Sequence, residues 1–138
     1  VCEKLLAVNR PGKAAGAGFY EYPQGGTKYL WPELTNMFPQ QTPLEQQEMI
    51  DRMLIVQALD TVRCLEEGVL RSVADANIGS IFGWGFSPFN GGTLQYINGA
   101  GLKNVIEKAK ALEAKYGERF SVPKLLQDKA DKGELFVD

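Results

Sequence analysis

The sequence predicts an all-α fold, and three observations support this prediction. Apolar residues recur at helical spacing along most of residues 43–138. Three of the resulting segments stop at a glycine (Gly68, Gly117 and Gly133), the residue most favoured just after a helix. No segment shows the alternation that a sheet of useful size would need. We therefore expect a helical bundle over residues 43–138.

Residues 1–42 are expected to form an extended arm, because glycine and proline are too dense there for a long helix. The arm begins with the end of a helix at residues 1–8. Two aromatic pieces follow at residues 19–22 and 28–31. They either pair as a small hairpin or lie separately across the helical body, and the sequence leaves both arrangements open.

The longest predicted helix spans residues 42–67 and is expected to be central. Thr42 is placed at its N-cap, Pro43 at its first position and Glu45 at its third, which together form a capping box. Its apolar residues cover more than one face: Met49, Ile50, Met53, Leu54, Val56, Leu59, Val62 and Leu65. Such a helix is usually packed on two sides, so aspartate at Leu54 is expected to prevent folding.

Four shorter helices are predicted after it. The first covers about 74–82 and the second 93–98, where Gly99 is expected to end it. The third spans 102–116 and has one clean apolar face. The last begins at Pro123, and Phe136 is expected to fold back onto it.

Composition excludes several classes of function. The chain has 138 residues and a net charge of −2 with no block of like charges, which predicts neither nucleic-acid nor anionic-membrane binding. No apolar run approaches the roughly 18 residues of a membrane span. Histidine is absent, which excludes Ser-His-Asp and Cys-His mechanisms and most zinc sites within this chain. Cys2 and Cys64 have no metal-binding spacing, and Cys64 is expected to be a small buried residue.

The chain starts with Val1 instead of methionine, so we expect it to be a processed or excised product whose missing chemistry lies upstream. The cysteine usage favours a reducing, cytoplasmic setting.

Three glycine pairs resemble the beginning of a dinucleotide loop, at residues 16–18, 83–85 and 99–101. None has the third glycine, and none follows a buried strand, so no nucleotide site is predicted within the chain. Lys13, just before the first pair, either meets a phosphate of a neighbouring ligand or is an ordinary surface lysine, and we favour the second.

Charged side chains offer no clear catalytic group. Glu66, Glu67 and Asp75 could gather as carboxylates, although a solvated helix end is the better interpretation because adjacent residues face differently. Arg52 and Arg63 lie within the long helix, where an ion pair or extension to solvent is favoured over ligand binding.

The most informative segment is residues 75–96, where glycines alternate with large aromatics. Glycine permits positive φ and close backbone approach, so the segment is expected to form a corner of the fold. The candidate residues of this structural or interface corner are Gly79, Gly85, Phe86, Pro88, Gly91, Gly92 and Tyr96. The aromatics Trp84, Phe86, Phe89 and Tyr96 either line an acyl or ring pocket or pack in a domain or subunit contact, which we favour.

Several motifs, in this order and spacing, carry a family resemblance. They are residues 12–22 (GKAAGAGFYEY), 52–68 (RMLIVQALDTVRCLEEG), 75–79 (DANIG), 85–88 (GFSP), 91–92 (GG), 116–117 (YG) and 119–120 (RF). The chain resembles the last C-terminal domain of 3-hydroxyacyl-CoA dehydrogenases, a helical fold like the C-terminal domain of 6-phosphogluconate dehydrogenase. It is most similar to the multifunctional alpha subunit of the bacterial fatty acid oxidation complex.

The resemblance implies oxidation of L-3-hydroxyacyl-CoA to 3-ketoacyl-CoA with NAD by the full-length enzyme. The family's catalytic His-Glu pair and dinucleotide glycines belong to a preceding domain, so no catalytic, cofactor-binding or metal-binding residue is assigned here. The implied partners are the preceding NAD-binding and helical domains, acyl-CoA, and a second copy or a thiolase subunit. Asn77 stands where a second Asp is expected, and Ala14 where a basic residue is common. These differences weaken the case for an arm that contacts CoA.

Overall fold

The structure is a computed structural model that describes residues 1–39 and 43–138. The chain divides into two compact units, Val1–Pro43 and Leu44–Asp138. Seven α-helices and a single two-stranded sheet are found among the described residues, which confirms the all-α prediction. None of the helices described is both long and apolar enough to cross a membrane.

The N-terminal unit is a small helix-and-hairpin structure. It contains α1 (Cys2–Ala7), the 3₁₀ turn η1 (Lys13–Ala15), β1 (Tyr20–Glu21), β2 (Tyr29–Leu30) and α2 (Leu34–Met37). The strands pair antiparallel, with Tyr20 opposite Leu30 and Glu21 opposite Tyr29. Of the two arrangements left open by the sequence, the hairpin is therefore correct.

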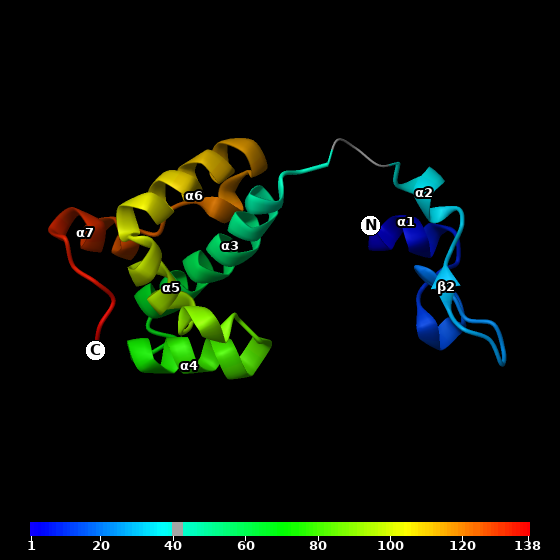
Figure 1. The fold of residues 1–138 in the computed structure, drawn as a ribbon, viewed down its shortest axis with the longest axis horizontal. Coiled ribbons are helices and arrows are strands. Elements are labelled where there is room, and N and C mark those ends of the chain that lie inside the picture. The colour runs from blue at the N-terminus through cyan, green and yellow to red at the C-terminus, as the bar shows by residue number, and fades with distance from the viewer. Residues whose placement is uncertain (40–42) are drawn as a thin grey trace. The chain divides into compact units, whose positions relative to one another are not determined.

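The second unit is a helical bundle. It contains α3 (Gln46–Glu66), α4 (Val73–Trp84), η2 (Pro88–Asn90), α5 (Thr93–Ala100), α6 (Leu102–Tyr116), η3 (Glu118–Phe120) and α7 (Lys124–Lys132). The helix α3 packs against α5, α6 and α7, which confirms that it is central. Figure 1 shows α4 and α5 gathered at one end of α3.

The buried face of α3 differs from the predicted one. Its fully buried residues are Ile55, Ala58, Leu59 and Val62, at the 3.6-residue period of a single face. Leu54, where aspartate is expected to prevent folding, is only partly buried, and the fully buried neighbour is Ile55. The first turns are exposed, with Met49, Ile50 and Met53 open to solvent. Cys64 is half-buried, where a buried residue was expected.

The predicted start of α3 is also wrong. The helix begins at Gln46, so Glu45 is its N-cap and Pro43 lies before it. Glu45 has φ −57° and ψ 140°, and its own side chain makes no capping hydrogen bond. Thr42, the predicted N-cap, lies outside the described residues.

Glycine marks most of the helix ends. Positive φ angles at Gly68, Gly117 and Gly133 confirm the three predicted stops. Gly99 is not a stop, because α5 continues to Ala100 and ends at Gly101. The helix α4 begins one residue before the predicted start and continues two beyond the predicted end, whereas α6 has the predicted bounds.

The residues after α7 return to the bundle. Phe136 is 1% exposed and folds back into the core cluster that includes Leu126 and Ala130 of α7, as predicted. The Asp138 carboxylate accepts hydrogen bonds from the backbone N–H groups of Val73 (2.5 Å) and Ala74 (2.9 Å). A carboxylate is favourable there because the first turn of a helix presents unpaired donors and a positive dipole end. The tail thus stabilises the start of α4.

Candidate functional site

The glycine-aromatic corner begins where α4 ends. Gly85 is in the left-handed region (φ 79°, ψ 32°) and its N–H bonds to the carbonyl of Ile81. The N–H of Phe86 bonds to the carbonyl of Ser80 at 3.0 Å. This pair of reverse bonds is the usual glycine-dependent helix end. It turns Phe86 inward, where the ring is 2% exposed.

Gly92 sets the distance between α4 and α5. A Cβ atom added to Gly92 would lie 2.5 Å from the Asn77 Cα, and its φ is +104°. Both facts require glycine, because a side chain would collide with the backbone of α4. The predicted role of Gly92 as a shape determinant therefore has a direct physical basis.

Asn77 supplies the cap that Gly92 cannot provide. Its Oδ1 accepts hydrogen bonds from the backbone N–H groups of Leu94 (2.9 Å) and Gln95 (3.0 Å) at the start of α5. The neighbouring Ser80 hydroxyl donates to the carbonyl of Asn77 (2.8 Å) and accepts from the Thr93 N–H (3.2 Å). From the sequence, Asn77 was notable only as a departure from the family pattern. The sequence did contain a signal for this role: the N-cap of α5 is a glycine, which has no side chain to accept hydrogen bonds from the first N–H groups of the helix.

Four of the other predicted corner residues have a defined structural role, and the fifth, Gly79, does not. Pro88 starts η2, and Gly91 follows it with φ 72°. Phe86 and Tyr96 form an edge-to-face pair with ring centroids 6.2 Å apart. Burial raises the pKa of the Tyr96 hydroxyl, and the charge of Asp51 adds to the effect. Gly79 is not required by a close neighbour, since a Cβ there would meet nothing within 4 Å.

The aromatics of the corner do not converge on one cavity. Phe86 is buried, whereas Phe89 is 100% exposed and lines an open pocket with Tyr96. Trp84 lines a different pocket of about 330 Å³ between α3 and α4, and its indole N–H donates to Gln57 Oε1 at 2.9 Å. The alternative of one aromatic acyl pocket within this unit is therefore not supported.

An exposed apolar face covers the outside of α4. The helix has a single charged residue, Asp75, in 12 positions. Ile78 and Phe82, one helical turn apart, are 58% and 85% exposed. Exposed apolar side chains that lie together in this way are candidates for a contact with another surface.

The charged candidates have structural partners. Glu66 Oε1 accepts the N–H of Leu125 (3.1 Å) at the start of α7. Arg63 pairs with Asp60 (2.6 Å) and donates to the carbonyl of Ser121 (2.7 Å). Over residues 1–39 and 43–138, no three His, Cys, Asp or Glu side chains are grouped as metal ligands.

The three glycine pairs are unsuited to a dinucleotide. Gly85 ends α4, Gly101 lies between α5 and α6, and Gly16 follows the three-residue turn η1. A dinucleotide loop must connect a buried parallel strand to a helix that points its N-terminus at the phosphates. The described residues contain no such unit, so they do not fit NAD.

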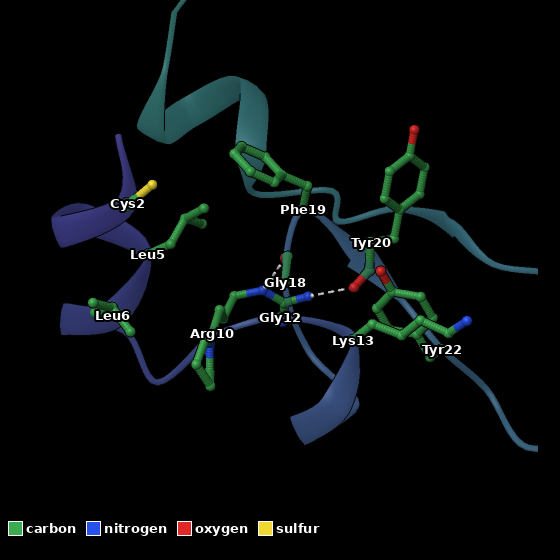
Figure 2. Close-up of a pocket in the computed structure, with 11 residues that line it drawn as sticks. Cys2, Leu5, Leu6, Arg10, Gly12, Lys13, Gly18, Phe19, Tyr20 and Tyr22 are labelled. Carbon is green, nitrogen blue, oxygen red and sulfur yellow. Dashed lines mark hydrogen bonds between the residues drawn. The ribbon is translucent and has the colours of Figure 1, made fainter. Parts of the chain in front are cut away.

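The N-terminal unit contains a pocket of about 420 Å³. Figure 2 shows residues of α1 on one side of it, the hairpin tyrosines on the other, and Arg10 between them. Arg10 donates to the carbonyls of Gly18 (2.8 Å) and Tyr20 (3.2 Å) and pairs with Glu21 (2.9 Å). Its guanidinium carbon is 4.2 Å from the ring centroid of Trp31. Arg10 was not among the residues predicted from the sequence, although these contacts connect the segments of the unit.

Lys13 and Gly18 also belong to this unit. Lys13 lines the same pocket and is exposed. Gly18 is buried, and a Cβ on it would lie 2.9 Å from the Gly12 Cα, so this close approach requires a glycine.

The whole chain is similar to known proteins. No family model matches it. It is 37% identical over 139 residues to the fatty acid oxidation complex subunit alpha of Shewanella loihica, a match that covers 99% of the chain and 20% of the relative. The subunit of the same name from Vibrio cholerae is 39% identical with the same coverage. The one from Vibrio campbellii is 36% identical over 141 residues, which is 100% of the chain and 20% of the relative.

The chain is homologous to one part of this alpha subunit. Identity of this level over the whole chain confirms the resemblance that the motifs indicated. The chain spans about a fifth of the length of these fatty acid oxidation complex alpha subunits. About four-fifths of each alpha subunit lies outside the segment that matches this chain. The Gly92–Asn77 contact and the apolar face of α4 therefore belong to a segment that, in these relatives, is part of a longer chain.

Proposed function

We propose that this chain is an accessory C-terminal domain of an NAD-dependent 3-hydroxyacyl-CoA dehydrogenase of fatty acid β-oxidation. The full-length enzyme would oxidise L-3-hydroxyacyl-CoA to 3-ketoacyl-CoA, in a cytoplasmic protein that also carries an enoyl-CoA hydratase part. The observation that carries the proposal is the match of the entire chain to a fifth of the fatty acid oxidation complex alpha subunit.

In this proposal the chain has a structural role and does not carry out the chemistry itself. It lacks histidine and therefore the commonest general base at neutral pH. NAD would accept the hydride in another part of the enzyme. The outer face of α4, with Ile78 and Phe82 exposed, would pack on the preceding domains. Burial of these side chains stabilises a contact by about 1.5–3 kcal/mol each.

A domain replacement tests the proposal. The homologous fifth of the Vibrio cholerae alpha subunit is replaced by this chain, and NADH-dependent reduction of acetoacetyl-CoA is measured. The unaltered relative and a variant that lacks the segment serve as controls. We expect activity in the replacement, none in the deletion and none in the isolated chain. Turnover by the isolated chain, or an inactive replacement that is folded by circular dichroism, would contradict the proposal.

A second candidate function is dimerisation or docking of a partner such as a thiolase subunit, without a role in the dehydrogenase. The exposed apolar residues of α4 and η2 favour it, since Phe82 and Phe89 are 85% and 100% exposed. Sedimentation of the chain distinguishes the two. A dimer that Phe82→Ser converts to monomer supports this candidate, whereas a monomer at high concentration supports the accessory domain.

A further inference from the structure

A groove on the N-terminal half of α3 shares no lining residue with the corner or with the pocket of the N-terminal unit. Its volume is about 390 Å³, within the range of roughly 300–1,000 Å³ that is typical of small-molecule sites. Its wall is apolar except for two arginines. The lining residues are Leu44, Met49, Arg52, Met53, Val56, Arg119 and Phe120.

The apolar wall of the groove is open to solvent. Leu44, Met49 and Met53 are 39%, 44% and 65% exposed, whereas Phe120 is 2% exposed and belongs to the core. Methionine is unbranched and polarisable, so it adapts to ligands of variable shape. An alkyl chain in this groove would remove the exposed methionines from water.

Arg52 has one acidic neighbour, Glu48, whose pKa is lowered by hydrogen bonds from Lys115 and Tyr116 and to a smaller extent by the charge of Arg52. Neither Arg52 nor Arg119 forms an ion pair among the described residues. Arg52 lies over the ring of Tyr116, with its guanidinium carbon 4.0 Å from the centroid. The nearby Glu48 carboxylate is already bonded to Lys115 (2.8 Å) and to the Tyr116 hydroxyl. Both guanidinium groups can therefore donate to a carboxylate or phosphate, whose geometry they match.

An apolar groove with two unpaired guanidinium groups has the chemistry to recognise an anionic amphiphile. We propose that it binds the alkyl chain of a fatty acyl compound, whose carboxylate or phosphate head pairs with Arg52 and Arg119. The choice of a fatty acyl tail rests on the proposed function, while the need for a tail and an anion rests on the groove itself. The site is a non-catalytic one, since it has no group that could act on the ligand.

Calorimetric titration of the 138-residue chain tests this site with four probes, each below its micelle concentration. Decanoate and decanoyl-CoA carry both tail and charge, decanol carries only the tail, and coenzyme A carries only the charge. We expect at least one of the first two to bind about tenfold more tightly than decanol and coenzyme A. Tighter binding of decanoate assigns the head as a carboxylate, and tighter binding of decanoyl-CoA assigns it as phosphate. Absence of binding, or equal affinity for decanol, would overturn the proposal.

Two variants locate the site. Arg119→Gln and Met53→Gln alter exposed side chains and should leave thermal unfolding unchanged, while each weakens binding about threefold to tenfold. Arg71→Gln and Phe89→Ser make comparable changes at exposed residues outside the groove and should leave the affinity unchanged. Wild-type affinity in both groove variants would contradict the assignment. The domain replacement described above can succeed or fail independently of this result, so the two proposals are tested separately.

Discussion

Asn98 and Phe136 are joined by a pair of hydrogen bonds between one side chain and one backbone. The Asn98 amide donates from Nδ2 to the Phe136 carbonyl (2.8 Å), and its Oδ1 accepts from the Phe136 N–H (2.9 Å). The amide of Asn98 thus satisfies both the N–H and the carbonyl of Phe136, a residue that follows the last helix. This contact attaches the tail to α5 and places the Phe136 ring in the core.

Substitutions at this contact should destabilise the helical unit. Asn98→Ala leaves the two backbone groups of Phe136 without partners and should cost about 1–3 kcal/mol in the free energy of unfolding. Phe136→Ala should cost about 3–5 kcal/mol because a large core side chain is lost. Urea denaturation measures both. Asn104→Ala, at an exposed asparagine whose amide donates to the carbonyl of Ala100, is the control and should change stability little.

Alanine at two glycines should have opposite effects. Gly92→Ala places a Cβ 2.5 Å from the Asn77 backbone at a φ of +104° and should destabilise the protein by at least about 2 kcal/mol. Gly79→Ala adds a Cβ into open space within α4 and should stabilise the isolated chain by about 0.5–1 kcal/mol. Thermal unfolding of both variants checks the contrast. A Gly92→Ala protein as stable as the wild type would show that the close approach of α4 and α5 is not required.

The core of α3 should be more sensitive at Ile55 than at Leu54. Ile55 is 0% exposed and its truncation to alanine should cost about 2–5 kcal/mol, whereas Leu54, partly in water, should cost less. The two alanine variants have the same helix propensity at adjacent positions, so each controls for the other. Equal losses of stability in urea would contradict the burial seen in the structure.

Glu48 should make stability depend on pH in the acid range. Hydrogen bonds from Lys115 and then from the Tyr116 hydroxyl lower the pKa of Glu48 below its usual 4.5. A carboxyl whose pKa is lower in the folded state contributes stability that is complete above its usual pKa and is lost as the pH falls through the folded value. Glu48→Gln should therefore flatten the decline of the melting temperature below about pH 4.5. Glu107→Gln, at an exposed carboxyl of α6, should leave that decline unchanged.

Helix periodicity and glycine stops were sufficient for the class of fold and for many of the boundaries. Local chemistry decides these features, since a glycine after a helix acts within one turn and an apolar period needs no distant partner. The bounds of α6 and the stops at Gly68 and Gly133 follow in this way. The absence of histidine likewise constrains chemistry without any structure.

Contacts between segments distant in sequence were decided only by the tertiary structure. Asn77 caps α5 from α4, and Arg10 closes the N-terminal unit through the carbonyls of Gly18 and Tyr20. The face of α3 that becomes buried, Ile55 in place of Leu54, depends on where the other helices pack. A pattern of apolar residues wider than one face leaves that choice open, because burial is settled by the partners and not by the helix alone.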